Sequence, residues 1–392
     1  MNRISDLEWK YVQEVLDNEF KTSLNSVFVS KLEQQFAEKF NCSFAISHVN
    51  GTATMHTALS ALGVGAGDEV IVPPLTMSST ALSVLHNQSI PVFADVDRDS
   101  FNLDPESVRK SITPRTKAII VVALYGLSPD YDEIMRVCQD HQLFLIEDNA
   151  ECFLGYYKGQ LVGSFGDFSS FSFQASKHMT CGEGGILTTN DEELANKARR
   201  FSSLGYAAVS SKKGKIPKRD IQNPDYDRHI TVGFNYRMSE VNAAVALGQL
   251  ERLEILVEQR KKVADLFESA VKGFAFVRPQ FTPKYCLNSY WTYAIVLETD
   301  KGPNDWYSFR DLFQENGGDH YYAAWKLSYN EPLFQNIIQK ESGVWQKYKP
   351  GLCPNAEYLQ PRMIQLKTNY WNISEAEKQA DILHKTLSEF GR

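Results

Sequence analysis

Short β-rich runs alternate with helical patterns along residues 43–148, and this alternation limits the possible folds more than any other feature of the chain. Strands separated by crossover helices are typical of a mostly parallel sheet with helices packed on it. The run at residues 117–124 is almost continuously apolar, as expected for a central strand that is covered on both faces. The sequence therefore predicts an α/β domain built on a mostly parallel sheet.

The expected elements follow one another closely. We expect strands at residues 43–47, 69–72, 117–124, 143–148 and 167–173, a further β-rich run at 91–93, and helices at 52–62, 78–86, 132–141 and 239–271. Residues 210–227 crowd lysine and arginine among glycine and proline, which predicts a mobile loop that is either simply solvated or a substrate lid. A boundary near Gly273 divides the chain into a large domain, residues 1–272, and a smaller α+β domain, residues 273–392.

Composition and charge argue against several classes of function. The net charge of -7 argues against a nucleic-acid partner, so any phosphate group must be held by a local site. No apolar stretch approaches the length of a transmembrane helix and the N-terminus lacks the apolar core of a signal peptide, so we expect a cytoplasmic protein without a membrane partner. The six cysteines are scattered without a CxxC pair, which predicts free thiols and no metal site.

One lysine occupies the position expected of a lysine that binds a cofactor covalently. Lys177 follows the apolar strand expected at 167–173 and precedes the Gly-rich turn at 182–185. The strand at 143–148 ends on Asp148, whose carboxylate would pair with a protonated pyridine nitrogen, although an aspartate there could also cap a helix. Together they predict pyridoxal 5'-phosphate as cofactor, with Lys177 forming the Schiff base and then moving protons between substrate and cofactor.

Two weaker signals indicate a phosphate site. Gly51 and Thr52 open a helix directly after a strand, so free N–H groups and a hydroxyl could receive a phosphate at the positive end of the helix. A plain helix cap explains the same residues. Ser172 adds a hydroxyl from the strand that precedes Lys177, which would place phosphate and Schiff base at opposite ends of one cofactor.

Five ordered segments resemble the DegT/DnrJ/EryC1/StrS family of sugar aminotransferases, which are pyridoxal phosphate enzymes of fold type I. They lie at residues 50–52, 67–74, 147–151, 172–185 and 233–240. The resemblance implies that Lys177 binds the cofactor, that Asp148 contacts the pyridine nitrogen, and that Gly51, Thr52 and Ser172 bind the phosphate. It also implies a homodimer in which Asn235 reaches the phosphate of the neighbouring subunit.

Some positions depart from the family pattern. Met77 stands where an aromatic ring usually stacks on the cofactor, and its thioether would cover the ring less rigidly. Glu151 replaces a frequent Gln or His, resembles the GDP-perosamine synthase branch, and would either approach the 3-hydroxyl of the cofactor or be an ordinary carboxylate. Counting back from the Gly-rich turn places Lys177, and not His178, at the cofactor position, which disfavours the related dehydratases.

The resemblance further implies that L-glutamate donates its amino group to a keto sugar, most specifically to C4 of a nucleotide-linked 4-keto-6-deoxyhexose, as in perosamine or viosamine. The C-terminal domain matches the family less well. Two alternatives therefore stay open: another keto or aldehyde acceptor, such as a small polyol phosphate or an unactivated sugar, and a cofactor-binding protein without turnover. The residues expected to line the substrate site are His229, Arg237, His320 and Tyr321, although aromatic residues in that segment could equally be core.

Overall fold

The computed structural model describes residues 2–19, 27–211, 218–299, 303–340 and 348–391. At its centre lies a seven-stranded sheet with the strand order β1 (Phe44–His48), β9 (Gly185–Thr189), β8 (Phe168–Ser172), β5 (Phe144–Asp148), β4 (Thr116–Val122), β2 (Glu69–Val72) and β3 (Ile90–Phe93). Strand β9 is antiparallel to both neighbours, and the remaining pairs are parallel. The predicted mostly parallel sheet is confirmed, although β9 was not among the expected strands.

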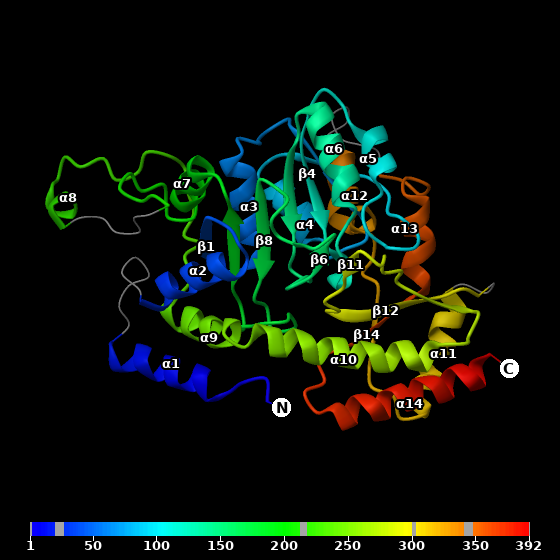
Figure 1. The fold of residues 1–392 in the computed structure, drawn as a ribbon. Coiled ribbons are helices and arrows are strands. Elements are labelled where there is room, and N and C mark those ends of the chain that lie inside the picture. Colours follow the sequence, from blue (N-terminus) through cyan, green and yellow to red (C-terminus); the bar gives the residue numbers. More distant parts are fainter. Residues whose placement is uncertain (1, 20–26, 212–217, 300–302, 341–347, 392) are drawn as a thin grey trace.

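Helices cover both faces of this sheet (Figure 1). One face packs against α3 (Gly51–Ala61), α4 (Ser79–His86) and α7 (Glu192–Phe201). The opposite face packs against α2 (Val27–Lys39), α9 (Glu240–Leu250), α5 (Pro105–Ser111) and α6 (Tyr131–His141). Ile119, Ile120 and Val121 in β4 are fully buried, which explains why that strand is apolar at successive positions.

The sheet brings the chemically important residues to one edge. Asp148, the last residue of β5, pairs with Val122 of β4 and with Ser170 of β8. Because parallel strands end at the same edge, the segment that leaves β8 at Ser172 emerges beside Asp148. This edge is where ligands bind in open α/β sheets.

The C-terminal part of the chain forms a smaller antiparallel sheet. Its strands are β10 (Val277–Pro279), β12 (Thr292–Leu297), β14 (Met363–Lys367) and β13 (Tyr322–Ala323), in that order. It packs against α10 (Leu253–Val271), α11 (Pro303–Glu315) and α14 (Ile373–Phe390), and α10 and α14 run side by side below it in Figure 1. A third sheet consists of β11 (Cys286–Leu287), β6 (Tyr156–Tyr157) and β7 (Gln160–Leu161).

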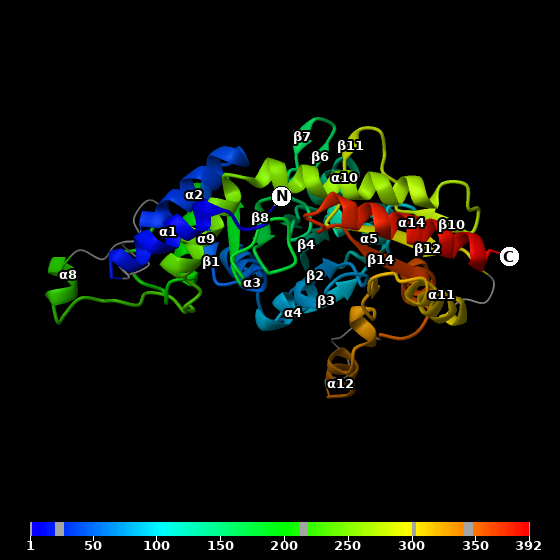
Figure 2. The ribbon, with the colours of Figure 1, turned by 90° about the horizontal axis from the view of Figure 1, so that it is seen from below.

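The remaining helices lie at the edges of the molecule. Helix α1 (Asp6–Asp17) packs along α9, and α8 (Lys218–Gln222) lies on an arm that extends away from the main body (Figures 1 and 2). Helices α12 (Pro332–Lys340) and α13 (Pro354–Leu359) belong to the C-terminal part, yet Tyr329 and Tyr348 from this region pack against Phe93 of β3. Because these contacts cross the boundary predicted at Gly273, the division into domains of residues 1–272 and 273–392 stays a proposal.

Two expectations need correction. The helix expected at 239–271 is two helices, α9 and α10, which meet at Glu251 and Arg252 although neither glycine nor proline marks the break. Gln249 and Arg252 at this junction donate to the Arg3 carbonyl oxygen over 2.8 and 3.0 Å, so the bend accommodates the N-terminal segment. Part of the expected loop at 210–227 is helix α8, and residues 212–217 lie outside the described residues.

Within the described part of the chain, no helix combines the length and the apolar character that a membrane crossing requires.

Candidate active site

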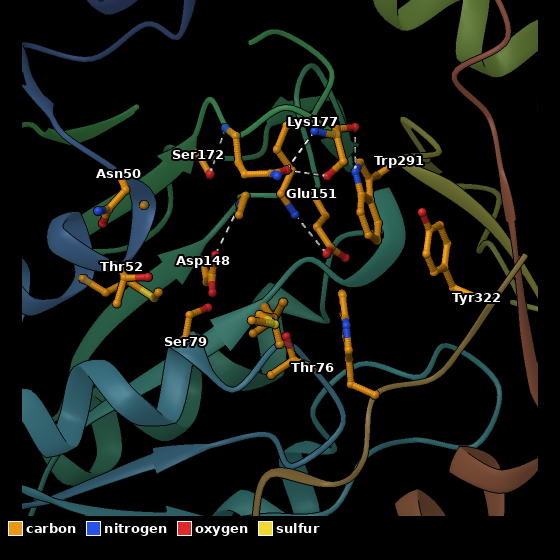
Figure 3. Close-up of a pocket in the computed structure, with 18 of the residues that line it drawn as sticks. Asn50, Thr52, Thr76, Ser79, Asp148, Glu151, Ser172, Lys177, Trp291 and Tyr322 are labelled. Atoms are coloured by element: carbon orange, nitrogen blue, oxygen red, sulfur yellow. Dashed lines mark hydrogen bonds and ion pairs between the residues drawn. The ribbon is translucent and has the colours of Figure 1, made fainter. Parts of the chain in front are cut away.

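A cavity of about 560 Å³ opens at the carboxyl ends of β5 and β8 and extends to the smaller sheet. Lys177, Asp148 and Glu151 line it, together with Gly51, Thr52, Met77 and Ser172. Figure 3 shows Asn50, Thr52 and Ser172 toward one end and Lys177 and Trp291 toward the other, with Asp148 between them. The volume lies in the range that small ligands and cofactors occupy.

Lys177 lies in an irregular loop, and its amine points into the cavity. Its Nζ is 3.1 Å from Glu151 Oε1 and 4.2 Å from the centre of the Trp291 ring. The side chain is only 12% exposed. An amine in this position is held by one charge and one aromatic face, and it remains open to a ligand in the cavity.

Asp148 is buried at the end of β5. Its Oδ2 accepts a hydrogen bond from Thr80 Oγ1 over 2.8 Å, and its Oδ1 accepts one from the Ala150 N–H over 3.2 Å. Burial raises the pKa of the Asp148 carboxyl, while these hydrogen bonds and the charge of Lys177 act in the opposite direction. A turn follows Asp148 rather than a helix, so the helix-cap interpretation fails. A buried carboxylate in this cavity suits a cationic ring nitrogen.

Glu151 joins the lysine to the wall of the cavity. Its Oε1 accepts from Lys177 Nζ, and its Oε2 accepts from the Tyr125 N–H over 3.1 Å. Burial raises the pKa of the Glu151 carboxyl, opposed by the charge of Lys177, and the nearby Asp148 charge raises it further. Tyr125 has a φ of 62°, which a tyrosine rarely adopts. The backbone that donates this hydrogen bond to Glu151 is therefore in a strained conformation.

The opposite end of the cavity has the form of an anion site. Asn50 caps α3 by accepting from the Ala53 N–H over 2.8 Å, and the N–H groups of Gly51 and Thr52 in the first turn have no acceptor within the helix. A Cβ at Gly51 would stand 2.9 Å from the Ser172 Cβ, so only glycine lets the helix end approach the β8 strand this closely. Helix cap and phosphate site are therefore compatible, and the residues fit a phosphate group.

Aromatic rings form the wall nearest the smaller sheet. Trp291 stacks on Tyr125 with ring centres 6.4 Å apart and on Trp325 with ring centres 6.0 Å apart. Tyr322 of β13 lies at the same side of the cavity (Figure 3). Met77 is 49% exposed and lines the cavity near Thr76.

The residues predicted to bind substrate do not line this cavity within the described chain. His229 is exposed, and its Nδ1 lies 2.7 Å from the Leu204 carbonyl oxygen. Asn235, which was predicted to reach the phosphate of a neighbouring subunit, is also exposed and does not line the cavity of its own chain. Arg237 is half-buried and its Nη1 has no hydrogen-bond partner among the described residues. His320 is exposed and contacts Gln314.

Tyr321 is partly buried beside the smaller sheet, where its ring packs against Trp306 and Phe313. Tyr322, the next residue, begins β13 and lines the cavity together with Ala323 and Ala324. His178 likewise points away from the cavity: it is fully buried and its Nε2 is 2.9 Å from the Ser289 carbonyl oxygen.

Several residues at the site carried no recognisable signal. Thr80 comes from a segment whose pattern only indicated a helix, and Gln174 lies in the 172–185 segment without a predicted role. Trp291, Trp325 and Gln365 come from the C-terminal part of the chain. The described residues contain no group of three or more histidine, cysteine or acidic side chains that could hold a metal ion. The six cysteines are free thiols, as predicted.

The chain is similar to known aminotransferases along almost its whole length. The profile of the DegT/DnrJ/EryC1/StrS aminotransferase family matches residues 2–385. The GDP-perosamine synthase of Escherichia coli O157:H7 is 35% identical over 292 residues, which cover 74% of this chain and 75% of that protein. A protein of Micromonospora echinospora named as an L-glutamine:3-amino-2,3-dideoxy-scyllo-inosose aminotransferase is 36% identical over 258 residues, which cover 64% of this chain and 58% of that protein.

A solved structure agrees with the fold as a whole. The aminotransferase from Psychrobacter cryohalolentis superimposes with a TM-score of 0.86 at 28% sequence identity, and the match covers 99% of this chain and 98% of that one.

Proposed function

Because this chain belongs to the DegT/DnrJ/EryC1/StrS family of pyridoxal phosphate-dependent sugar aminotransferases, we propose that it transfers the amino group of L-glutamate to C4 of a nucleotide-linked 4-keto-6-deoxyhexose. The products would be 2-oxoglutarate and a 4-amino sugar of the perosamine or viosamine type. The observation that carries the chemistry is the convergence of Lys177, Asp148 and an anion site on one cavity. The proposed acceptor is supported by the similarity to GDP-perosamine synthase.

Each residue has a place in this proposal. Lys177 Nζ would hold the cofactor, and the Gly51 and Thr52 N–H groups with the Ser172 hydroxyl would bind its phosphate. Asp148 would accept a hydrogen bond from the protonated pyridine nitrogen, and the Thr80 hydroxyl would keep that carboxylate in position. Met77 and the Trp291 ring border the space between these ends.

The bound cofactor would supply an electron sink for the carbon that loses its proton. Lys177 Nζ would take the proton from the Cα of L-glutamate in the first half of the reaction and return one to the acceptor carbon in the second. Glu151, 3.1 Å from Nζ, would hold the amine on the correct side of the cavity between these steps. The Trp291 and Trp325 rings would exclude water from this side of the cavity.

A homodimer with shared sites is part of the proposal. Asn235 is exposed and pairs with Ser203, which follows α7, rather than lining the cavity of its own chain. Its placement is compatible with contributing to the phosphate site of a second subunit. Ile230, Val232 and Phe234, which precede it, are exposed apolar residues that such an interface would cover.

The acceptor is tested with a panel of compounds. Purified protein with pyridoxal phosphate and L-glutamate is incubated with 4-keto-6-deoxyhexoses linked to GDP, dTDP or UDP, and 2-oxoglutarate and the amino sugar are measured by mass spectrometry. We expect turnover with one nucleotide-linked sugar. Absence of turnover with all of them would reject the proposed acceptor while leaving the half-reaction with L-glutamate to be judged separately.

A cyclic ketone without a nucleotide is the second candidate acceptor, and it is favoured by the similarity to the protein named as an inosose aminotransferase. That name also points to L-glutamine as donor. Including unactivated keto sugars, keto polyols and small polyol phosphates in the panel, with L-glutamine beside L-glutamate, separates the two candidates.

A further inference from the structure

The loop that carries Lys177 is held from outside by side chains from distant parts of the sequence. Between β8 and β9 the chain forms turns and bends, and the Lys177 N–H donates to the Gln174 carbonyl oxygen over 3.0 Å. The carbonyl groups of Ala175, Ser176 and Lys177 lie in turns and bends, so they have no backbone N–H partners from a regular helix or strand. Their partners must therefore come from other elements.

Two arginines and one tryptophan supply these donors. Arg3 donates to the Ala175 and Lys177 oxygens over 2.5 and 2.7 Å. Arg260 of α10 donates to the Ser176 and Lys177 oxygens over 2.7 and 3.0 Å. Trp291 Nε1 donates to the Ser176 oxygen over 3.0 Å, while the face of the same indole contacts the Lys177 amine. The Lys177 carbonyl oxygen thus accepts from both guanidinium groups.

These guanidinium groups are fixed in turn. Arg260 is 1% exposed and also donates to the Trp291 carbonyl oxygen and to Thr368 Oγ1. Arg3 and Arg260 lie 5.6 and 5.9 Å from the ring centre of Trp371. Every acceptor described above for the two groups is a neutral carbonyl or hydroxyl oxygen atom and not a carboxylate. Burying a guanidinium group costs free energy, which these hydrogen bonds to the loop and its surroundings must offset.

The N-terminal segment is held where Arg3 can reach the loop. The Arg3 carbonyl oxygen accepts from Gln249 Nε2 and Arg252 Nη1, and Arg252 Nη2 donates to the Asn2 oxygen over 2.7 Å. Glu8 accepts from Arg252 over 3.2 Å and caps the start of α1 together with Ser5. The break between α9 and α10 thus places the donors that hold the N-terminal segment.

We propose that Arg3 is a positioning residue of the active site, which together with Arg260 fixes the backbone from which Lys177 presents its amine. This inference rests on the proposed role of Lys177. During the reaction the lysine side chain must move while its backbone stays in place, and the two guanidinium groups hold that backbone without touching the reacting atoms. Misplacement of a reacting group by about 1 Å costs up to roughly 100-fold in rate.

The test compares Arg3→Met and Arg3→Lys with Arg278→Met in the full-length chain. Arg278 is the control because its guanidinium also donates to a distant carbonyl group, that of Arg98, and pairs with Glu298 over 2.7 Å, so that its substitution removes comparable bonds outside the loop that carries Lys177. Hydrogen–deuterium exchange of residues 174–182 is measured on the cofactor-free proteins, and the half-reaction with L-glutamate is followed by stopped-flow absorbance after loading with pyridoxal phosphate.

We expect Arg3→Met to raise exchange in the loop several-fold and to slow the half-reaction by roughly 10- to 100-fold at saturating L-glutamate. Arg3→Lys should recover part of the rate, because the ammonium group of lysine can replace one of the two guanidinium nitrogen donors but not both. Arg278→Met should match wild type. Unchanged exchange and rate in Arg3→Met, or equal changes in Arg278→Met, would overturn the inference. Failure of wild type to react with L-glutamate would reject the proposed function, and the exchange data would still decide the role of Arg3.

Discussion

Lys177 shares its cavity with two buried carboxyl groups, and the balance of these three charges determines what the amine can do. Asp148 is anchored by Thr80 and lies between the lysine and the anion site, whereas Glu151 bonds the amine directly. Each carboxyl group has its pKa raised by burial and lowered by the charge of Lys177. A cationic cofactor ring would stabilise Asp148 as a carboxylate.

Glu151→Gln tests the role of the second carboxyl group. The amide can still accept from the Tyr125 N–H but cannot balance the charge on Lys177, so we expect bound cofactor with a half-reaction slowed roughly tenfold, about 1.4 kcal/mol in the barrier. Burial raises the pKa of Glu151, so this carboxylate takes up a proton at a higher pH than an ordinary glutamate does. On acidification, the activity of wild type should therefore begin to fall at that higher pH. The variant should lack this acid limb.

The control for that experiment is Glu254→Gln, which removes a surface carboxylate that pairs with Lys39. Its pH–rate profile should match wild type. If Glu151→Gln retained the full acid limb, Glu151 would not be the group that controls the lysine.

Single residues show how far the sequence predicts the site. The sequence predicts Lys177, Asp148, Gly51 and Ser172 because each lies near the end of a strand, follows a strand or opens a helix, and the sheet brings such positions to one edge. The sequence predicted Tyr321 at the substrate site, whereas Tyr322 lines the cavity, because β13 has only two residues and too short a pattern to indicate which side chain faces the cavity. Their assigned functions stay predictions.

At the level of elements, the approach of α3 to β8 shapes the anion site. Gly51→Ala places a methyl group 2.9 Å from the Ser172 Cβ. We expect the dissociation constant for pyridoxal phosphate to rise roughly tenfold, since overpacking of this kind costs about 1–3 kcal/mol or shifts the backbone. Equilibrium titration of the visible absorption band measures it.

Gly65→Ala is the matched control, because no atom lies within 4 Å of a Cβ at that position. Its dissociation constant should equal that of wild type. Equal affinities of Gly51→Ala and wild type would show that the phosphate does not bind at the start of α3.

Strand β1 carries a buried histidine that makes stability depend on pH. His48 Nδ1 lies 2.8 Å from the Ile46 carbonyl oxygen and Nε2 lies 3.0 Å from Thr57 Oγ1, and burial lowers the pKa of His48 to about 4. Between its unfolded pKa of about 6.5 and about 4, only the unfolded chain takes up this proton. The free energy of unfolding should therefore fall as the pH is lowered through this window.

His48→Gln should reduce this fall by up to roughly 3 kcal/mol, because glutamine does not titrate. Urea unfolding of the cofactor-free protein at several pH values between 4 and 8 measures the slope. An identical slope in variant and wild type would show that another group controls acid unfolding.

Elements also show where sequence patterns lose information. The break between α9 and α10 carries neither glycine nor proline, and Arg252 at the break donates to the carbonyl oxygens of Asn2 and Arg3, about 250 positions away. Strand β9 follows a Gly-rich turn, and its antiparallel direction depends on how the Lys177 loop reverses the chain. The periodicity of apolar residues indicates which face of a helix or strand is buried. It does not indicate where contacts with a distant segment coincide with a change in chain direction.

At the scale of the whole molecule, the candidate active site brings together the N-terminal segment, the seven-stranded sheet and the smaller antiparallel sheet. Trp291 contacts the Lys177 amine and stacks on Trp325, and Arg3 and Arg260 donate to the backbone of the loop that carries Lys177. The predicted α/β class follows from the alternation of elements, whereas these long-range contacts have no local pattern. The donor, the acceptor and the dimer remain proposals.

The shared sites of the proposed dimer are tested by subunit mixing. Lys177→Ala and Asn235→Ala should each lose most activity as separate proteins. After mixing and exchange, a dimer with one subunit of each kind would contain one intact site, because Lys177 and Asn235 of the same site come from different chains. We expect about one quarter of wild-type activity in a statistical mixture. No recovery, with exchange demonstrated, would show that Asn235 serves its own chain.

The central claim is that Lys177 binds pyridoxal phosphate and carries out transamination with it. The most direct measurement is the absorption spectrum of the protein with pyridoxal phosphate before and after addition of L-glutamate, for wild type and Lys177→Ala. We expect a yellow band that bleaches on addition of L-glutamate in wild type only, with release of an equal amount of 2-oxoglutarate. A wild-type protein without the yellow band, or a variant that reacts as wild type does, would contradict the claim.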